Sequence, residues 1–301
     1  MLRITVPGST ANLGPGFDSV GLAVNRYLTL DVKLSDKRIF RPLSKDVAEI
    51  PSGKDNLVYQ TAEKVADHYR KALPACSVDV WSNIPLARGL GSSAAAISAG
   101  IELADALLCL GMTAQEKVRL ASLYEGHPDN VGASIMGGLV IGSHRADDTD
   151  VIHVQNLDID IVVVIPIYEI KTKDARKVLP TTFTREYAVE ASAISNMLVA
   201  ALLTKQWKLA GKMMEKDLFH QPFRLPLIPE IEAIRSSALN SAAFGVAISG
   251  AGPTVICFAE KGKGPQVKKK LINDFPHFQI EELSIDNKGS VVTKNEFQEQ
   301  M

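Results

Sequence analysis

The chain contains 301 residues, with 33 Lys and Arg against 34 Asp and Glu, so its formal net charge is −1. This balance, and the lack of any strongly basic segment, argue against nucleic acid and an anionic membrane surface as partners. The three cysteines, Cys76, Cys109 and Cys257, lie in apolar runs without the spacing of metal ligands. They predict buried, reduced thiols in a cytoplasmic protein. The length of the chain is enough for one large domain or two medium ones.

The N-terminal half mixes strands and helices. Residues 2–6 already alternate as a strand does, which leaves no room for a signal peptide. The longest apolar stretch, residues 94–110, contains Glu102 and Asp105 and is too short and too charged to span a membrane. Thr113 and Glu116 form a capping box that predicts a helix start. Hydrophobic periodicity predicts strands at residues 2–6, 28–34, 77–82, 137–142 and 159–166, and helices at 56–72, 95–109 and 113–125.

The C-terminal half is richer in long helices. Periodicity predicts helices at residues 185–204, 207–218, 229–239 and 265–274, and strands at 245–249, 254–259 and 278–284. Because the order lacks a regular βαβ repeat, it favours α+β lobes over a doubly wound sheet. The weakly polar turn at residues 146–150 is the expected boundary between domains 1–150 and 151–301.

Residues 85–96 combine a glycine-rich turn with the start of a buried helix. Gly89 and Gly91 would let the backbone approach an anion closely, because they carry no Cβ. The following Ser92 and Ser93 open the helix, where unpaired N–H groups and the helix dipole favour negative charge. This arrangement predicts a phosphate site, although such turns also serve packing alone. No Walker A lysine ends the loop, and Arg88 is the nearby cation.

Two polar clusters lie in the N-terminal half. Residues 7–18 are a turn-rich segment that offers Asn12 and Asp18 to a polar substrate, or forms an ordinary turn. Residues 125–130 offer a carboxylate that would complete a magnesium site with a serine hydroxyl of the loop. The alternatives for this second cluster are a structural histidine at His127 and a turn residue at Asp129.

Two more clusters lie in the C-terminal half. In residues 171–180, Arg176 is suited to a bidentate contact with a carboxylate or phosphate, or to a solvated surface position. Residues 248–254 form a glycine turn between two buried strands, which permits close approach of a ligand but also fits a plain hairpin.

Together these segments resemble the GHMP kinase family of small-molecule kinases over nearly the whole chain. The three family motifs occur in order at residues 7–18, 85–96 and 249–254. Within the family, residues 9–18, 125–130, 172–176 and 178–180 are most similar to members that phosphorylate L-homoserine. The resemblance implies a two-lobed α+β GHMP kinase fold, with an ATP-binding domain at 1–150, a C-terminal domain at 151–301 and the active site in the cleft between lobes. It also implies a homodimer.

The resemblance further implies a role for individual residues. The ATP-binding set is Asn56 beside the adenine, and Pro85, Leu86, Ala87, Arg88, Gly89, Leu90, Gly91, Ser92, Ser93, Ala94 and Ala95 around the phosphates. Mg²⁺ would be held by Ser92 or Ser93 together with Glu125, and the sequence does not choose between the two serines. The homoserine-binding set is Asn12, Asp18, His127, Arg176 and Arg224.

The chemistry of the substrate agrees with this set. The carboxylate of homoserine suits the guanidinium groups of Arg176 and Arg224, and its ammonium suits Asp18 and Asn12. Transfer of the γ-phosphoryl group depends mainly on positioning and on charge neutralisation, with Asp18 and Arg176 as the catalytic residues. Thr172 stands where an acidic base could have been, so the hypothesis is that Asp18 orients the hydroxyl without taking its proton.

Two other functions compete with this interpretation. A family member acting on another alcohol, such as mevalonate, would give Asp18 no ammonium to bind. A nucleotide- or amino-acid-binding regulator without turnover is disfavoured by the intact Ser92, Ser93 and Glu125, because loss of activity commonly appears first at the metal site.

Overall fold

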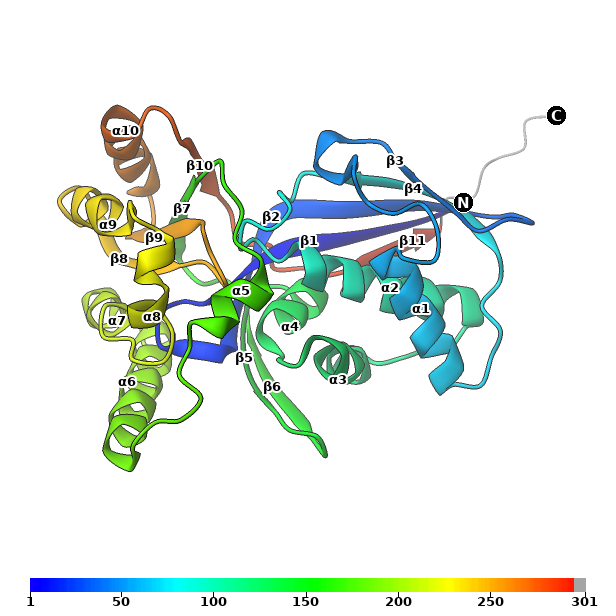
Figure 1. The fold of residues 1–301 in the computed structure, drawn as a ribbon, viewed down its shortest axis with the longest axis horizontal. Coiled ribbons are helices and arrows are strands. Elements are labelled where there is room, and N and C mark those ends of the chain that lie inside the picture. Colours follow the sequence, from blue (N-terminus) through cyan, green and yellow to red (C-terminus); the bar gives the residue numbers. More distant parts are fainter. Residues whose placement is uncertain (295–301) are drawn as a thin grey trace.

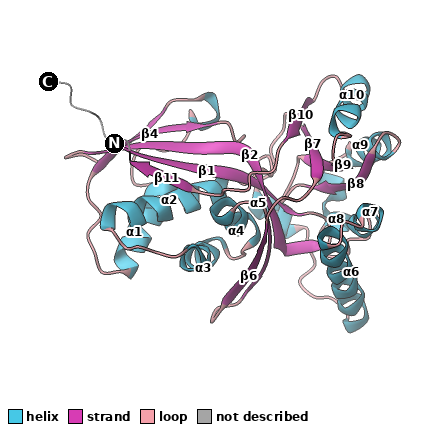
Figure 2. Ribbon diagram, turned by 180° about the vertical axis from the view of Figure 1, so that it is seen from behind, coloured by secondary structure: helices cyan, strands magenta, loops and turns pink. Residues whose placement is uncertain are grey.

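The computed structural model describes residues 1–294 of the chain, which form two lobes side by side (Figure 1). Each lobe contains one β-sheet (Figures 1 and 2). In the first lobe the helices lie against one face of the sheet, and in the second lobe helices cover both faces. The α+β class predicted from the irregular element order is therefore confirmed.

The first lobe is a seven-stranded sheet with four helices on one face (Figure 2). Its elements are β1 (Leu2–Asn12), β2 (Gly16–Leu34), β3 (Ile39–Pro42), α1 (Leu57–His68), β4 (Cys76–Ser82), α2 (Ser92–Leu108), α3 (Ala114–Glu125), α4 (Asp129–Met136), β5 (Leu139–His144), β6 (Thr149–Val154) and β11 (Val291–Lys294). The strand order is β11-β1-β2-β4-β3, with β5 paired to β2 and β6 paired to β5. Helix α1 buries Val58, Ala62 and Val65 because their spacing puts them on one face.

The second lobe is a four-stranded antiparallel sheet in the order β10-β7-β9-β8. Its elements are β7 (Ile159–Ile165), α5 (Thr172–Lys177), α6 (Arg185–Leu203), α7 (Trp207–Met214), α8 (Gln221–Arg224), α9 (Ile231–Leu239), β8 (Ala243–Ile248), β9 (Val255–Glu260), α10 (Gly264–Asp274) and β10 (Gln279–Leu283). Every residue of β7 is buried because both faces of the sheet are covered. Ile161 and Val163 share a core with α6 and α7, whereas Val162 and Val164 pack with α9 and α10.

The prediction of a turn-rich loop at residues 7–18 is wrong. Strand β1 continues to Asn12 and β2 begins at Gly16, so only residues 13–15 form the turn. The pairing of β1 with β2 absorbs Pro7 at a register shift between Pro7 and Gly8, where a strand tolerates proline. A second shift between Ala11 and Asn12 lets the hairpin bend into the second lobe, where it packs against α7.

Several other boundaries differ from the sequence prediction. Helix α1 ends at His68 instead of residue 72, and the short helices α4 and α5 were not predicted because each has too few turns for a clear period. Cys109 is exposed, so the prediction of three buried thiols is wrong there. It lies just past the end of α2 in a left-handed conformation.

The expected domain boundary at residues 146–150 coincides with the end of a hairpin. His144 of β5 pairs with Thr149 of β6, so both strands remain part of the first sheet. The chain enters the second sheet only at β7, and β11 returns to pair with β1. We therefore propose that the first lobe extends to about residue 154 and also includes the returning strand.

Candidate active site

The glycine-rich turn before α2 needs its glycines for steric reasons. Gly89 and Gly91 both have positive φ, 80° and 74°. A Cβ on Gly89 would lie 2.2 Å from the carbonyl oxygen of Ser249, and one on Gly91 would lie 2.3 Å from Ser9 Oγ. Helix α2 begins at Ser92 without a side-chain cap, so its first N–H groups are available to an anion. The segment therefore has the properties of a phosphate-binding loop.

The same loop is held in place by the second lobe. The hydroxyl of Ser249 donates to the carbonyl of Gly89 at 2.6 Å, and the N–H of Thr254 donates to the carbonyl of Arg88 at 3.2 Å. The guanidinium of Arg88 donates to the carbonyls of Pro166 at 3.1 Å and Ile167 at 2.7 Å. Arg88, expected to contact ATP, thus uses its side chain to hold the loop against the segment that follows β7.

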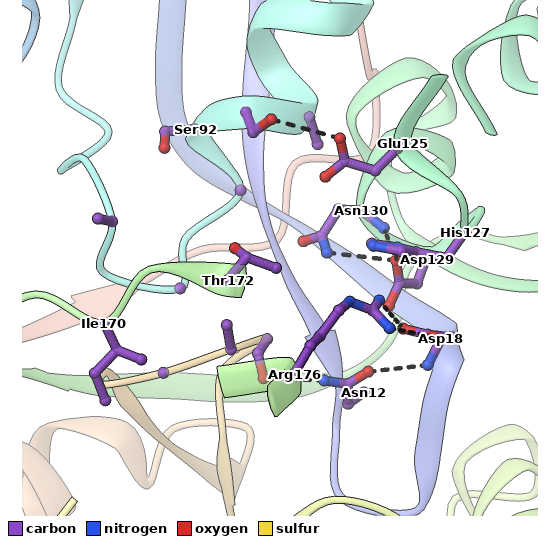
Figure 3. Close-up of a pocket in the computed structure, with 18 of the residues that line it drawn as sticks. Asn12, Asp18, Ser92, Glu125, His127, Asp129, Asn130, Ile170, Thr172 and Arg176 are labelled. Atoms are coloured by element: carbon purple, nitrogen blue, oxygen red, sulfur yellow. Dashed lines mark hydrogen bonds and ion pairs between the residues drawn. The ribbon is translucent and has the colours of Figure 1, made fainter. Parts of the chain in front are cut away.

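A cleft with a cavity of about 80 Å³ lies in front of this loop and is lined by both lobes (Figure 3). Its lining includes the predicted residues Asn12, Asp18, Ala87, Gly89, Gly91, Ser92, Ser93, Ala94, Glu125, His127, Arg176 and Arg224. Residues of six helices and strands (β1, β2, α2, α3, α5 and α8) and of two loops converge here, so the structure brings the predicted homoserine-binding set and the phosphate loop together.

A second, more apolar cavity of about 280 Å³ meets the first at Ser92 and Ser93. Its other lining residues include Asn56 and Leu86. The amide oxygen of Asn56 accepts from the N–H groups of Val58 and Tyr59, so this side chain caps α1. Asn56 thus borders a cavity suited to a flat apolar group while its oxygen is committed to the fold.

Four residues of the predicted ATP-binding set, Pro85, Arg88, Leu90 and Ala95, line neither cavity. Leu90 and Ala95 are buried in the hydrophobic core. The resemblance assigned a continuous segment to the phosphates. Because side chains of residues 85–95 point in different directions, only some of these residues face the two cavities.

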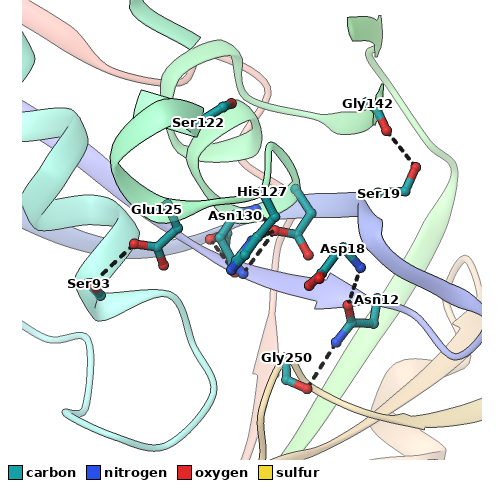
Figure 4. Close-up of polar contacts among 12 residues, drawn as sticks. Asn12, Asp18, Ser19, Ser93, Ser122, Glu125, His127, Asn130, Gly142 and Gly250 are labelled. Carbon is teal, nitrogen blue, oxygen red and sulfur yellow. Dashed lines mark hydrogen bonds and ion pairs between the residues drawn. The ribbon is translucent and has the colours of Figure 1, made fainter. Parts of the chain in front are cut away.

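Asp18 and Arg176 form a bidentate ion pair across the cleft (Figure 3). Arg176 Nη1 and Nη2 lie 3.0 and 2.7 Å from the two carboxylate oxygens of Asp18. Asn12 fixes the position of Asp18, because its amide oxygen accepts the Asp18 N–H at 3.1 Å and its amide nitrogen donates to the Gly250 carbonyl at 3.0 Å (Figure 4). Both side chains are partly exposed to the cleft, which keeps them available to a ligand.

Arg224 is held deep below this pair, with 2% of its surface exposed. It donates to the carbonyls of Gly250 at 2.9 Å and Ala175 at 3.2 Å. Burial, and secondarily the positive charge of Arg176, lower the pKa of Arg224 to about 10, so it remains a cation at neutral pH. The Phe17 ring lies 5.4 Å from the Arg224 guanidinium carbon and 5.5 Å from that of Arg176.

His220 orients Arg224 from behind. Arg224 Nη1 lies 3.2 Å from His220 Nδ1, and His220 Nε2 lies 2.9 Å from the carbonyl oxygen of Gly14. Since a guanidinium only donates, Nδ1 accepts and Nε2 carries the proton, which defines a neutral tautomer. Complete burial lowers the pKa of His220 and keeps it neutral. Sequence analysis missed this residue, although its spacing of four from Arg224 puts both on one helical face.

Glu125 and Ser93 lie on the opposite side of the cleft (Figure 4). Ser93 Oγ is 3.4 Å from Glu125 Oε2. Burial raises the pKa of Glu125, and the charge of Asp129 adds to this, so a cation beside the carboxylate would be favoured. These are oxygen donors next to the start of α2, which is the ligand type that Mg²⁺ prefers.

His127 and Asp129 form a hydrogen-bonded pair between Glu125 and Asp18. Burial opposes protonation of His127, but the hydrogen bond and charge of Asp129 outweigh it, and the pKa of His127 is raised. Asp129 also accepts the N–H of Asn130 at 2.7 Å. Asp129, Asn130 and Phe17 line the cleft without having been singled out as site residues.

Comparison with known proteins identifies the family. The model described as GHMP kinases N terminal domain matches residues 56–138, and that described as GHMP kinases C terminal matches residues 198–277. The chain belongs to the GHMP kinase family. The fold expected from the resemblance is thereby confirmed.

Several homoserine kinases are similar to this chain over nearly its whole length. A homoserine kinase of Bacillus pumilus is 58% identical over 292 residues, which covers 97% of this chain and 94% of the relative. A homoserine kinase of Halalkalibacterium halodurans is 54% identical over 95% of this chain and 93% of its own length. The crystal structure of a homoserine kinase from Cytophaga hutchinsonii superposes with a TM-score of 0.85 at 27% identity, covering 97% of both chains.

Proposed function

We propose that this protein transfers the γ-phosphoryl group of ATP to the side-chain hydroxyl of L-homoserine, giving O-phospho-L-homoserine for threonine synthesis. The homoserine kinases at 54–58% identity support this activity. The observation in the structure that carries it is the Asp18–Arg176 ion pair facing the phosphate loop across one cleft. A carboxylate and two guanidinium groups in one cavity match a zwitterionic substrate with a hydroxyl at its far end.

In this proposal homoserine inserts its two charged groups beside the existing ion pair. Its ammonium binds Asp18 next to the Asn12 amide, and its carboxylate binds Arg176 and Arg224. The hydroxyl then extends toward the start of α2. His127 lines the same cavity and completes the polar wall.

ATP is the co-substrate of a kinase, and two contiguous cavities suit its two ends. The apolar cavity beside Asn56 and Leu86 would receive the adenine, and the N–H groups at the start of α2 would receive the phosphates. Mg²⁺ would be held by Glu125 and by Ser93, whose hydroxyl lies beside the carboxylate, or by Ser92. It would neutralise charge on the phosphoryl oxygens.

The residues of this chain contribute mainly position and charge. The loose transition state of phosphoryl transfer needs its nucleophile deprotonated late, so no strong base is required. Asp18 orients the substrate through its ammonium, and Arg176 adds positive charge to the cleft as phosphate charge redistributes. Thr172 lines the cavity at the start of α5 and offers a hydroxyl, which is no general base.

The test is ADP release by the purified protein with Mg·ATP and single candidate alcohols. We expect turnover with L-homoserine and little with D-homoserine, L-threonine, L-serine or mevalonate. Turnover with mevalonate alone would overturn the substrate while leaving a kinase. ATP binding without turnover on any alcohol would instead favour a regulator. The cytoplasmic location and the homodimer implied by the resemblance stay predictions.

A further inference from the structure

The segment between β7 and α5, residues 166–171, connects the second sheet to the helix that carries Arg176. We call it the α5 linker. It contains no helix or strand, and Ile167 within it is 81% exposed. Ile170 and Thr172 line the cleft together with Arg176, so the linker and α5 form one wall of the candidate active site (Figure 3). The position of Arg176 in the cleft therefore depends in part on what holds this linker.

Arg88 of the phosphate loop holds the α5 linker through its side chain. Its Nε lies 3.1 Å from the carbonyl oxygen of Pro166, and its Nη2 lies 2.7 Å from that of Ile167. Its Nη1 lies 3.0 Å from a carboxylate oxygen of Glu169. A guanidinium carries five N–H donors in one plane, so it can hold several acceptors in a fixed arrangement. All three nitrogens of this guanidinium contact the linker, and we call these contacts the Arg88 clasp.

The backbone of the phosphate loop adds a further contact beside the clasp. The N–H of Ile170 donates to the carbonyl of Ala87 at 3.2 Å. Ala87 has a φ of 52°, in the left-handed region that a residue with a Cβ adopts only where its surroundings hold it there. Ala87 and Ile170 both line the cleft. The loop and the linker are therefore joined at the edge of the candidate active site.

The Arg88 clasp lies between the two sites that must meet for phosphoryl transfer. On one side are Gly89, Gly91 and the start of α2, where the phosphates of ATP are expected. On the other side is α5, whose Arg176 pairs with Asp18 in the expected homoserine site. In-line transfer requires the hydroxyl behind the γ-phosphorus, and an error of about 1 Å in such a geometry can cost about 100-fold in rate. Arg88 itself lines neither cavity and is only 17% exposed, so it would affect this geometry without touching a substrate.

We propose that Arg88 is a positioning residue, which holds α5 and Arg176 at the distance from the phosphate loop that phosphoryl transfer requires. It acts through the α5 linker. This inference rests on the proposed function, because it puts the acceptor alcohol on the α5 side of the cleft and the phosphates on the loop side. It differs from the role that the resemblance implies for Arg88, which is direct contact with ATP.

The first test compares the kinetics of Arg88→Met and Arg88→Lys with those of the wild-type protein. Methionine fills part of the same space but donates no hydrogen bond, whereas lysine keeps the charge and some donors. We expect kcat of Arg88→Met to fall about 10–100-fold, while the KM values for L-homoserine and ATP change less than about threefold. Arg88→Lys should recover part of the loss. Calorimetric titration with ADP counts the intact nucleotide sites, so that kcat is expressed per site.

Arg119→Met is the matched control. Arg119 makes the same kind of contact, since its Nη1 lies 2.8 Å from the carbonyl oxygen of Arg145 and its Nη2 lies 2.6 Å from that of Ala146. These carbonyls belong to the turn between β5 and β6, and none of the three residues lines either cavity. We expect an unchanged kcat per site. An equal fall in Arg119→Met would mean a general loss of structure and would overturn the proposal.

The second test asks whether Arg88 acts through α5. If it does, Arg88→Met should cost little more once Arg176 is absent, because there is no guanidinium left to position. The value of kcat/KM for homoserine in the double variant should then lie within about threefold of that of Arg176→Ala alone. Losses that multiply in full would mean that Arg88 acts independently of Arg176, which contradicts the proposal.

Two further outcomes would overturn the positioning role. A higher KM for ATP with an unchanged kcat would make Arg88 a ligand of ATP, and unchanged kinetics would show that the clasp has no part in the reaction. Failure of the proposed function is a separate result, because the wild-type protein would then not phosphorylate L-homoserine. An active wild-type protein with an equally active Arg88→Met variant would contradict this inference alone.

Discussion

Arg176 and Asp18, separated by 158 residues in the chain, meet in a bidentate ion pair with N···O distances of 3.0 and 2.7 Å. Asp18 belongs to β2 and Arg176 to α5, so the pair joins the two lobes at the cleft. Each partner holds the other where a zwitterionic ligand needs it. In the proposed complex the ligand's opposite charges would insert beside this pair, which makes the site pre-organised rather than assembled on binding.

Removing the guanidinium should affect one substrate only. We expect Arg176→Ala to weaken homoserine binding by about 1.5–3 kcal/mol, because the substrate carboxylate loses a charged hydrogen-bond donor in a partly exposed site. The KM for ATP should change little. Arg185→Ala, on the exposed start of α6, is the matched control. Steady-state kinetics with each substrate varied in turn gives the answer, and equal losses for both substrates would show that Arg176 has another role.

Asp18→Asn separates orientation from proton transfer. The amide keeps the size of the side chain but loses the charge that binds the ammonium and Arg176. We expect the KM for homoserine to rise steeply, with a smaller fall in kcat. Homoserine affinity is measured directly by calorimetry. Abolished turnover with unchanged affinity would contradict an orienting role and give Asp18 a direct part in the chemistry.

Glu125→Gln tests the proposed metal ligand. We expect a lower kcat and a higher Mg²⁺ concentration for half-maximal rate, because the neutral amide is a weaker ligand. Glu215→Gln, an exposed change at the end of α7, should leave the metal dependence as it is. Titration of activity with Mg²⁺ at saturating substrates measures the effect. An unchanged Mg²⁺ curve would remove Glu125 from the metal site.

Gly91→Ala should lower the stability of the fold by more than the backbone strain of a positive φ would account for. The new Cβ would lie 2.3 Å from Ser9 Oγ and 2.8 Å from the Ser9 nitrogen, in addition to a φ of 74°. Gly111→Ala has a similar φ of 69° but no atom within 4 Å of the new Cβ, so it measures the strain alone. Strain of this kind costs about 1–2 kcal/mol. Urea unfolding should show a clearly larger loss for Gly91→Ala, accompanied by weaker ATP binding.

The neutral state of His220 predicts an acid-sensitive fold. Its pKa is lower in the folded than in the unfolded protein, so the folded state binds fewer protons. The contribution of His220 to folding stability is therefore fully present above the unfolded-state pKa of 6.5. It is lost as the pH falls below 6.5 toward the lower pKa of the folded state. His220→Gln should weaken this dependence and raise the KM for homoserine but not for ATP. His68→Gln, an exposed change, should do neither. Unfolding free energies across this pH range are the measurement.

The sequence predicts the long periodic elements and the chemistry-bearing loops, because these depend on local spacing and residue type. The capping box of α3 is an example: Thr113 and Glu116 exchange their hydrogen bonds as predicted. The segment at residues 7–18 was misinterpreted because glycine and proline there serve strand bulges and close packing instead of a solvated turn. Tertiary pairing, which no local pattern shows, decides such cases.

Part of the candidate site could likewise be read from residue types. Asp18 and Arg176 were both predicted to bind substrate, but nothing in their spacing shows that they pair with each other. Arg88 was assigned to ATP by its place in the motif, whereas its side chain holds backbone carbonyls of the other lobe. His220 went unnoticed because a buried neutral histidine looks like any other histidine in a sequence.

The hairpin of β1 and β2 has a consequence for how this chain can be divided. Its base lies in the first sheet, its tip rests on α7, and β11 returns from the second lobe to pair with β1. A cut at about residue 154 would leave an N-terminal fragment without the edge strand β11 and a C-terminal fragment without the hairpin tip that packs against α7. Neither piece holds a complete core of its own. The two lobes therefore form one folding unit. Any circular permutant or split reporter built from this chain must keep the β1–β2 hairpin and β11 connected to both lobes.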